Sequence, residues 1–228
     1  VVRWAIRNGR AALFEDCGLG KTLQQLEWAR QVAEHTRKPV LILTPLAVAQ
    51  QTVQEAYKFG INASVAASQA DVTIHGIYIT NYEKLEHFDT SAFVGVVLDE
   101  SSILKSHDGA FRKALTEGCA EIPYRSAWTA TPAPNDFTEL GTHAAFPGVK
   151  TREEMLAEYF VHDGGSTQDW RLKGHAVQAF WRWLATWGAV VKRPSDLGHD
   201  DAGYNLPPLD IVEHVVGLRD EDVRAAGR

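Results

Sequence analysis

The chain is poor in the residues that mark secreted and membrane proteins. It has two cysteines, Cys17 and Cys119, in 228 residues, too few for a disulfide framework or a cysteine metal cluster. It has no signal peptide and no apolar run long enough to cross a bilayer, so we expect a cytoplasmic protein without a membrane partner. The first residue is Val1 rather than Met, which predicts a chain trimmed from a longer protein.

An excess of basic charge is also lacking. Lys and Arg number 23 against 29 Asp and Glu, which leaves a formal net charge of −6 at pH 7. The summed field therefore gives no sign of a nucleic-acid partner, although an acidic body can still carry a local basic groove. Hydrophobic residues make up 45% and charged residues 23%, a composition that is typical of a globular domain and does not indicate disorder.

The stretch from Leu13 to Thr22 is typical of a strand end, a glycine turn and a helix start. Such a turn lets backbone N–H groups approach a polyphosphate, and the helix directs the positive end of its dipole to the same place. Lys21 can reach the β and γ phosphates of a nucleotide, and the Thr22 hydroxyl can hold Mg²⁺. The predicted ATP-binding residues are Cys17, Gly18, Leu19, Gly20, Lys21, Thr22 and Leu23.

One residue departs from the general phosphate-loop pattern. The pattern G-x-x-x-x-G-K-[ST] has glycine where this chain has Glu15. Taken alone, the stretch could also be a glycine-rich turn that happens to precede Lys-Thr. The residues downstream must decide between these two interpretations.

Strand and helix patterns alternate through the first 130 residues. Apolar runs predict strands at 11–14, 40–43, 76–80, 94–98 and 126–129, and helical spacing predicts helices at 21–35 and 46–59. Asn81 is expected to cap a further helix. This alternation predicts an α/β fold with a doubly wound parallel sheet, whose ligands bind beyond the carboxyl ends of the strands.

Two of these strands end in polar residues that suit nucleotide hydrolysis. Asp99 and Glu100 follow the strand at 94–98, where an Asp can hold Mg²⁺ and a neighbouring Glu can activate water. Thr129 ends the strand at 126–129, Thr131 follows it, and both suit a sensor of the γ-phosphate. An acidic pair at a strand end is usually only polar, but together with the phosphate loop it predicts a catalytic site.

Five motifs in this order resemble superfamily 2 helicases. They are Leu-Phe-Glu-Asp-Cys-Gly-Leu-Gly-Lys-Thr-Leu-Gln, Leu-Thr-Pro, Ile-Thr-Asn-Tyr-Glu, Leu-Asp-Glu-Ser-Ser-Ile-Leu-Lys-Ser and Thr-Ala-Thr-Pro. The closest resemblance is to the Swi/Snf-type ATPases, including their bacterial and phage relatives. That family usually has an acidic pair before the loop, matched here by Glu15 and Asp16, which accounts for the missing first glycine.

The resemblance implies a RecA-like P-loop NTPase lobe that uses ATP and Mg²⁺. Residues 1–147 would be the ATP-binding lobe, 148–193 a mainly helical, aromatic-rich appendage, and 194–228 a linker toward a missing second RecA-like lobe. Lys21, Asp99 and Glu100 would be catalytic, Thr22 and Asp99 would hold the metal, and Thr129 and Thr131 would couple the nucleotide to the sheet. DNA, duplex rather than single-stranded, would be the partner. The implied nucleic-acid contacts are Thr44, Pro45, Thr80, Asn81 and Lys105.

Two alternatives belong to other functional classes. A nucleotide-regulated recruitment module without turnover would be free to lose Lys21, Asp99 and Glu100, yet all three are present. A small-molecule P-loop kinase predicts an arginine-rich lid and no Thr-Ala-Thr-Pro strand.

The tryptophans between 170 and 187 are also open to two interpretations. They are interleaved with basic residues, which is compatible with a base-stacking surface, but aromatic residues at helical spacing are more often part of a core.

Overall fold

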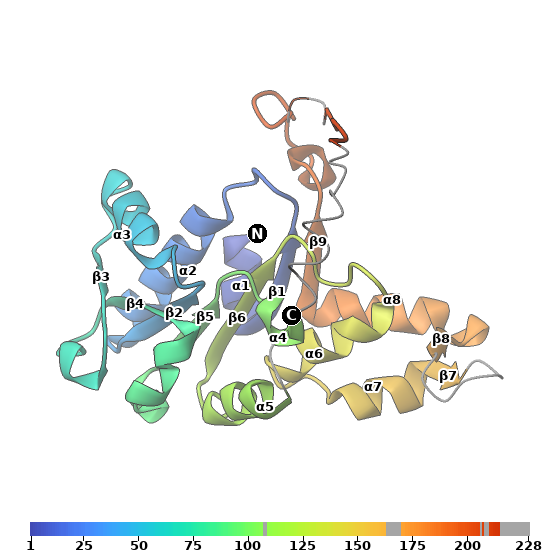
Figure 1. Cartoon of the computed structure of the whole chain (residues 1–228), viewed down its shortest axis with the longest axis horizontal. Helices are drawn as coiled ribbons and strands as arrows, with labels where there is room; N and C mark the ends of the chain where they lie inside the picture. Colours follow the sequence, from blue (N-terminus) through green and yellow to red (C-terminus); the bar gives the residue numbers. More distant parts are fainter. Residues whose placement is uncertain (107–108, 163–169, 206, 208–209, 215–228) are drawn as a thin grey trace, which may run out of the picture.

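A seven-stranded, wholly parallel sheet forms the centre of the computed structural model (Figure 1). The structure describes residues 1–106, 109–162, 170–205, 207 and 210–214. The strands, in their order across the sheet, are β3 (Ala63–Val65), β4 (Ile77–Asn81), β2 (Val40–Thr44), β5 (Gly95–Leu98), β6 (Tyr124–Thr129), β1 (Arg10–Glu15) and β9 (Gly188–Val191). The predicted α/β fold with a parallel sheet is therefore confirmed.

Helices cover both faces of the sheet. The first face packs against α1 (Val2–Asn8), α2 (Lys21–Thr36) and α3 (Ala49–Lys58). The second face packs against α4 (Ile103–Ser106), α5 (Gly109–Gly118), α6 (Leu140–Ala145), α7 (Arg152–Tyr159) and α8 (Val177–Trp187). Short 3₁₀ helices η1 (Gln69–Asp71), η2 (Tyr82–His87), η3 (Thr90–Ala92), η4 (Phe137–Glu139), η5 (Gly174–Ala176) and η6 (Pro194–Leu197) connect these elements, and β7 (Phe160–His162) pairs with β8 (Trp170–Leu172).

The two-sided cover explains why the strands have continuous apolar sequences. In β1, Ala11 and Leu13 belong to the core under α1–α3, whereas Ala12 and Phe14 belong to the core under α4–α8. Both side-chain rows are therefore removed from water, which is the usual state of a parallel strand. Burial on both faces is the main source of stability that the sheet provides.

The strand β9 was not indicated by the sequence. It follows α8 directly and pairs with β1, so that Glu15 lies opposite Val191. A residue with a side chain would not fit easily at Gly188, because a Cβ there would lie 3.1 Å from Leu184 and 3.3 Å from Phe14. Part of the predicted appendage, residues 148–193, thus completes the main sheet. The domain boundaries themselves stay a prediction, and residues 215–228 of the expected linker lie outside the described residues.

The segment after β4 agrees with its prediction in part. Asn81 was expected to cap a further helix, and it is the N-cap residue of the 3₁₀ helix η2, but its side chain makes no cap hydrogen bond. It is buried, and the 3₁₀ helix η2 begins at Tyr82. Asn81 is also the last residue of β4 and pairs with Thr44, and its side chain is buried rather than directed to the N–H groups of η2.

The tryptophans of α8 contribute mainly to packing. Trp187 is buried beside Phe14, and the Trp183 ring lies 5.3 Å from that of Tyr159. Trp181 is 40% exposed and meets Phe137 edge-on. The core interpretation therefore holds for Trp183 and Trp187, and the base-stacking interpretation stays open only for exposed side chains such as Trp181.

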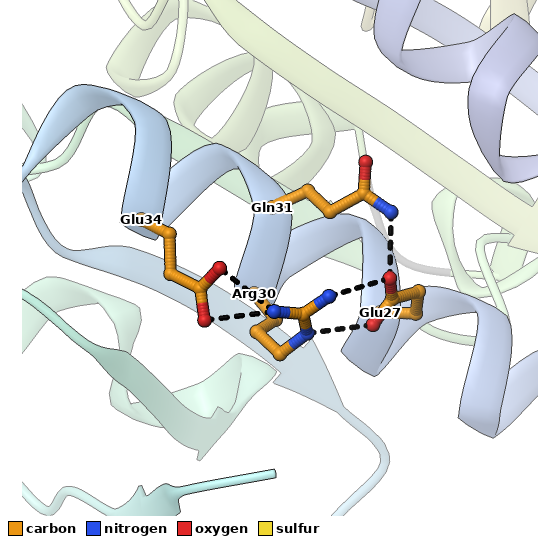
Figure 2. Close-up of polar contacts among 4 residues, drawn as sticks. All are labelled: Glu27, Arg30, Gln31 and Glu34. Carbon is orange, nitrogen blue, oxygen red and sulfur yellow. Dashed lines mark hydrogen bonds and ion pairs between the residues drawn. The ribbon is translucent and has the colours of Figure 1, made fainter.

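A polar network spans one side of α2 (Figure 2). The Arg30 guanidinium donates hydrogen bonds of 2.7 and 2.8 Å to each of the carboxylates of Glu27 and Glu34. Gln31 Nε2 donates to Glu27 at 2.6 Å. The hydrogen bond from Arg30 lowers the pKa of Glu27. These pairs, at helical spacings of three and four, support a helix that has no side-chain cap at its N-terminus.

We expect Arg30→Ala to lower the free energy of unfolding by about 0.5–1 kcal/mol, because two partly exposed pairs are lost and each contributes about 0.3–0.5 kcal/mol. Urea unfolding at low and high salt measures this loss, which should shrink in high salt because ions screen exposed pairs. Lys113→Ala is the matched control, since its pair with Glu117 is longer, at 3.8 Å, and more exposed. A loss that is independent of salt would contradict the electrostatic origin.

Candidate nucleotide site

The phosphate loop lies between the end of β1 and the start of α2. Gly18 and Gly20 have φ angles of 81° and 76°, in the left-handed region that favours glycine. Gly20 is the N-cap of α2, and no side chain accepts a hydrogen bond there. The first backbone N–H groups of α2 are therefore not capped by a side chain, which is the arrangement that binds phosphate at a helix N-terminus.

The side chain of Lys21 lies over the loop. Its Nζ donates to the carbonyl oxygens of Glu15 and Asp16, both at 3.0 Å. One turn later, Gln24 Nε2 donates to the Glu15 carboxylate at 2.7 Å and to the Leu19 carbonyl at 3.0 Å. Both ends of the loop are thus tied to α2, which keeps the Lys21 ammonium at the loop.

The other predicted ATP-binding side chains lie in different surroundings. Cys17 is exposed, and its backbone N–H donates to Asp16 Oδ1 at 2.8 Å. Thr22 is partly buried in the first turn of α2. Leu23 packs against the core under α1–α3, so its contribution to a phosphate site is confined to the backbone.

Glu15 occupies the position of the missing glycine and is almost fully buried, with 1% of its surface exposed. Its Oε2 accepts the hydrogen bond from Gln24, and its Oε1 has no hydrogen-bond partner. Burial raises the pKa of Glu15, while Gln24 and Lys21 act in the opposite direction. Glu15, the last residue of β1, therefore connects the start of the loop to α2 through its hydrogen bond with Gln24.

We expect Glu15→Gln to be more stable than the wild type near neutral pH and to lose this advantage in acid. The raised pKa means that the native state holds the Glu15 proton more tightly than the unfolded chain. The stability that protonated Glu15 contributes is present at low pH and is lost as pH rises through the raised pKa of the native state. Urea unfolding at about pH 4 and about pH 8 measures the difference, with exposed Glu86→Gln as control. An advantage of equal size at both pH values would contradict this account.

Asp99 follows β5 and is held by three elements. Its N–H donates to the Leu43 carbonyl at 2.9 Å, its carbonyl accepts from the Tyr82 hydroxyl at 2.7 Å, and its Oδ1 accepts from Gln25 Nε2 at 2.8 Å. Burial raises the pKa of Asp99, and the hydrogen bond from Gln25 opposes this effect. A carboxylate desolvated in this way is favoured in its charged form by a bound cation.

Glu100 has an unusual backbone and a fixed side chain. Its φ angle is 51°, in the left-handed region that residues other than glycine rarely adopt. Its Oε1 accepts hydrogen bonds from Thr129 Oγ1 at 2.6 Å and from Ser102 Oγ at 2.7 Å. Thr129 Oγ1 in turn accepts from the Thr131 N–H at 3.1 Å. Such backbone strain persists where surrounding contacts hold it, and it is concentrated at functional sites.

These parts lie at one edge of the sheet. Because β5, β6 and β1 are neighbouring parallel strands, the residues that follow them meet at their carboxyl ends. The structure thus brings together the phosphate loop, the pair Asp99 and Glu100, and the segment from Thr129 to Thr131. The chemical roles predicted for these residues stay predictions.

The predicted nucleic-acid contacts are less accessible than the motif suggested. Thr44 is buried, and its Oγ1 donates to the Thr80 carbonyl at 3.3 Å. Thr80 and Asn81 are also buried, because they end paired strands, and Pro45 is partly buried. The side chains of Thr44, Thr80 and Asn81 therefore do not face solvent in this conformation. Lys105 lies in α4, and its side chain lies outside what the structure describes.

The sequence interpretation missed several residues that shape this site. Gln24 and Gln25 follow the loop by one helical turn, so their spacing could have indicated them. Tyr82 carried no such signal. The buried pair Ser101 and His143 carried no such signal either, because the two residues are 42 positions apart in the chain. Ser101 Oγ lies 3.4 Å from His143 Nδ1.

Residues 2–147 match the family described as the SNF2-related domain. The chain belongs to the SNF2-related domain family. The matched range contains the phosphate loop, the Asp99–Glu100 pair and the Thr129–Thr131 segment, so the resemblance seen in the motifs is confirmed. None of the curated proteins matches the chain.

Solved structures are similar to this SNF2-related domain in fold. The SWI2/SNF2 ATPase core domain of Sulfolobus solfataricus has a TM-score of 0.65 at 21% identity, over 90% of this chain and 44% of that one. The same core in complex with dsDNA has a TM-score of 0.65 at 22% identity, over 86% and 43%. The UvsW helicase of bacteriophage T4 has a TM-score of 0.51 at 13% identity, over 63% and 55%. The chain spans less than half the length of the two Sulfolobus chains.

Within the described part of this SNF2-related domain, no helix has the length and apolarity needed to cross a bilayer. No cluster of three or more His, Cys, Asp or Glu residues suited to a metal ion occurs among the same residues.

Proposed function

We propose that this chain is the N-terminal ATP-binding lobe of a nucleic-acid-dependent ATPase, a Swi/Snf-like helicase or double-stranded DNA translocase. The observation that carries this proposal is the hydrogen bond from Gln25 Nε2 to Asp99 Oδ1 at 2.8 Å. It connects α2, the helix that bears Lys21, to the carboxylate pair after β5. This contact joins a phosphate-binding helix terminus to two acidic residues at the same sheet edge. Phosphoryl transfer from a nucleotide needs this combination.

Each residue then has a definite task. Lys21 binds the β and γ phosphates, and Glu100 orients and deprotonates the attacking water. The residues present fit Mg²⁺, which takes few protein oxygens together with phosphates: the Thr22 hydroxyl and the desolvated Asp99 carboxylate would hold it. When bound, Mg²⁺ neutralises charge that develops on the phosphates. Thr129 donates a hydrogen bond to Glu100 and accepts one from the Thr131 N–H, and the two threonines couple the nucleotide to the sheet.

The remainder of the motor lies beyond this lobe in the proposal. Residues 1–147 form the ATP-binding lobe, 148–193 are its appendage, and 194–228 lead toward a second RecA-like lobe without which hydrolysis does not proceed. Duplex DNA is the proposed partner, since one structure of similar fold is a complex with dsDNA. Contacts around Thr44, Pro45, Thr80, Asn81 and Lys105 would be to the nucleic-acid backbone, which carries little sequence information. A cytoplasmic location stays a prediction.

Nucleotide binding is tested by Lys21→Ala, titrated with a fluorescent ATP analogue. We expect affinity to fall by about 10- to 150-fold, because a charge-assisted contact of about 1.5–3 kcal/mol is lost. Lys58→Ala is the control, since this lysine pairs with Glu55 on α3 and lies outside the loop. Equal affinities of Lys21→Ala and the wild type would refute the phosphate-loop assignment.

A further inference from the structure

Gln25 is a buried polar residue that no motif required. It lies on α2, one turn after Thr22, with none of its surface exposed. Its Nε2 donates to Asp99 Oδ1 at 2.8 Å, although the two residues are 74 positions apart. Its Oε1 is buried and has no hydrogen-bond partner.

A half-satisfied amide in this place needs a physical reason. The neighbouring buried residues of α2 (Leu26, Trp28 and Ala29) are apolar, so an apolar side chain would suit this helix face. Burying a polar oxygen without a partner costs about 1–3 kcal/mol. A glutamine that tolerates this cost is therefore serving an interaction other than packing.

Asp99 is the group on which Gln25 acts. The Tyr82 hydroxyl fixes the Asp99 carbonyl from η2, and Gln25 fixes the carboxylate from α2. No hydrogen bond between Thr22 and Asp99 occurs in the structure, although both are described. Among the side chains of α2, it is thus Gln25 that donates a hydrogen bond to this carboxylate.

We propose that Gln25 is a positioning residue for metal binding: it orients the Asp99 carboxylate toward Mg²⁺, and its unpartnered Oε1 accepts a hydrogen bond from water that the metal carries. This inference rests on the proposed function, in which Asp99 holds Mg²⁺ beside ATP. Groups that hydrogen-bond to metal ligands fix their orientation, and replacing such a group lowers metal affinity or activity by about 10- to 100-fold. Gln25 itself touches neither the nucleotide nor the reacting atoms.

The test is a Mg²⁺ titration of ATP-analogue binding to Gln25→Met, which keeps the length of the side chain but removes both polar groups. We expect half-maximal enhancement of binding to require about 10- to 100-fold more Mg²⁺ than in the wild type. Affinity for the analogue in EDTA should equal that of the wild type. Thermal unfolding without nucleotide shows whether the fold is retained, and Gln25→Asn, an amide one methylene shorter, is the second variant.

Gln31→Met is the matched control, because it is the same substitution on the same helix, outside the site. It should leave the Mg²⁺ requirement unchanged. A purely structural role for Gln25 would lower affinity equally with and without Mg²⁺, and that result would overturn the inference. An unchanged Mg²⁺ requirement in both Gln25 variants would overturn it as well. If the wild type binds the analogue without any dependence on Mg²⁺, the proposed function fails, and the inference fails with it.

Discussion

Glu100→Gln should lose most ATP turnover in a protein that carries both lobes, while it still binds ATP with Mg²⁺. The carboxylate of Glu100 is already oriented, since Thr129 and Ser102 both donate to its Oε1. Glutamine has the same shape but cannot take a proton from water. Loss of a general base lowers the rate by about 10²- to 10⁴-fold.

Single-turnover hydrolysis and analogue titration separate the two effects. The rate of the chemical step should fall, whereas the dissociation constant should stay within a few-fold of the wild-type value. Glu83→Gln is the matched control, because Glu83 is an exposed residue of η2. A variant that keeps its rate within a factor of a few would assign water activation to another residue. A wild type that binds ATP and never hydrolyses it would favour the recruitment module instead.

The 228-residue chain alone should bind ATP but show little nucleic-acid-stimulated turnover. In two-lobed motors of the kind this chain resembles, the γ-phosphate is clamped between the lobes and an arginine of the second lobe stabilises the transferring charge. Such an arginine contributes about 10³- to 10⁵-fold to the rate. We therefore expect a protein that includes the second lobe to hydrolyse ATP faster than the chain alone by a factor in this range.

The measurement compares ATP hydrolysis by the chain with that by the protein extended through the proposed second lobe, each with duplex DNA, single-stranded DNA and RNA. The extended protein carrying Lys21→Ala is the control that shows whether the recovered activity uses this phosphate loop. Strong stimulated hydrolysis by the 228 residues alone would contradict the two-lobe assignment. Stimulation by RNA but not DNA would contradict the proposed partner.

The local features of this protein were determined by the sequence itself. The glycines at 18 and 20 meet a backbone requirement of the loop, and the structure gives both the positive φ that they permit. Helix α8, Val177–Trp187, forms where aromatic and apolar residues recur at helical spacing. The continuous apolar runs became parallel strands because such runs bury both faces under helices. Each of these properties depends on residues close together in the chain.

The tertiary structure alone decided which distant residues meet. The register between β2 and β4 pairs Thr44 with Asn81 and buries both side chains, and the Asn81 side chain makes no cap hydrogen bond to η2. The return of β9 to β1, and the contact of Gln25 with Asp99, join segments that lie far apart in sequence. Periodicity and propensity report on a window of a few residues, whereas these contacts arise from the packing of whole strands and helices. For this reason the phosphate loop could be predicted from the sequence, whereas the contacts by which Gln25 and Tyr82 hold Asp99 in place could not.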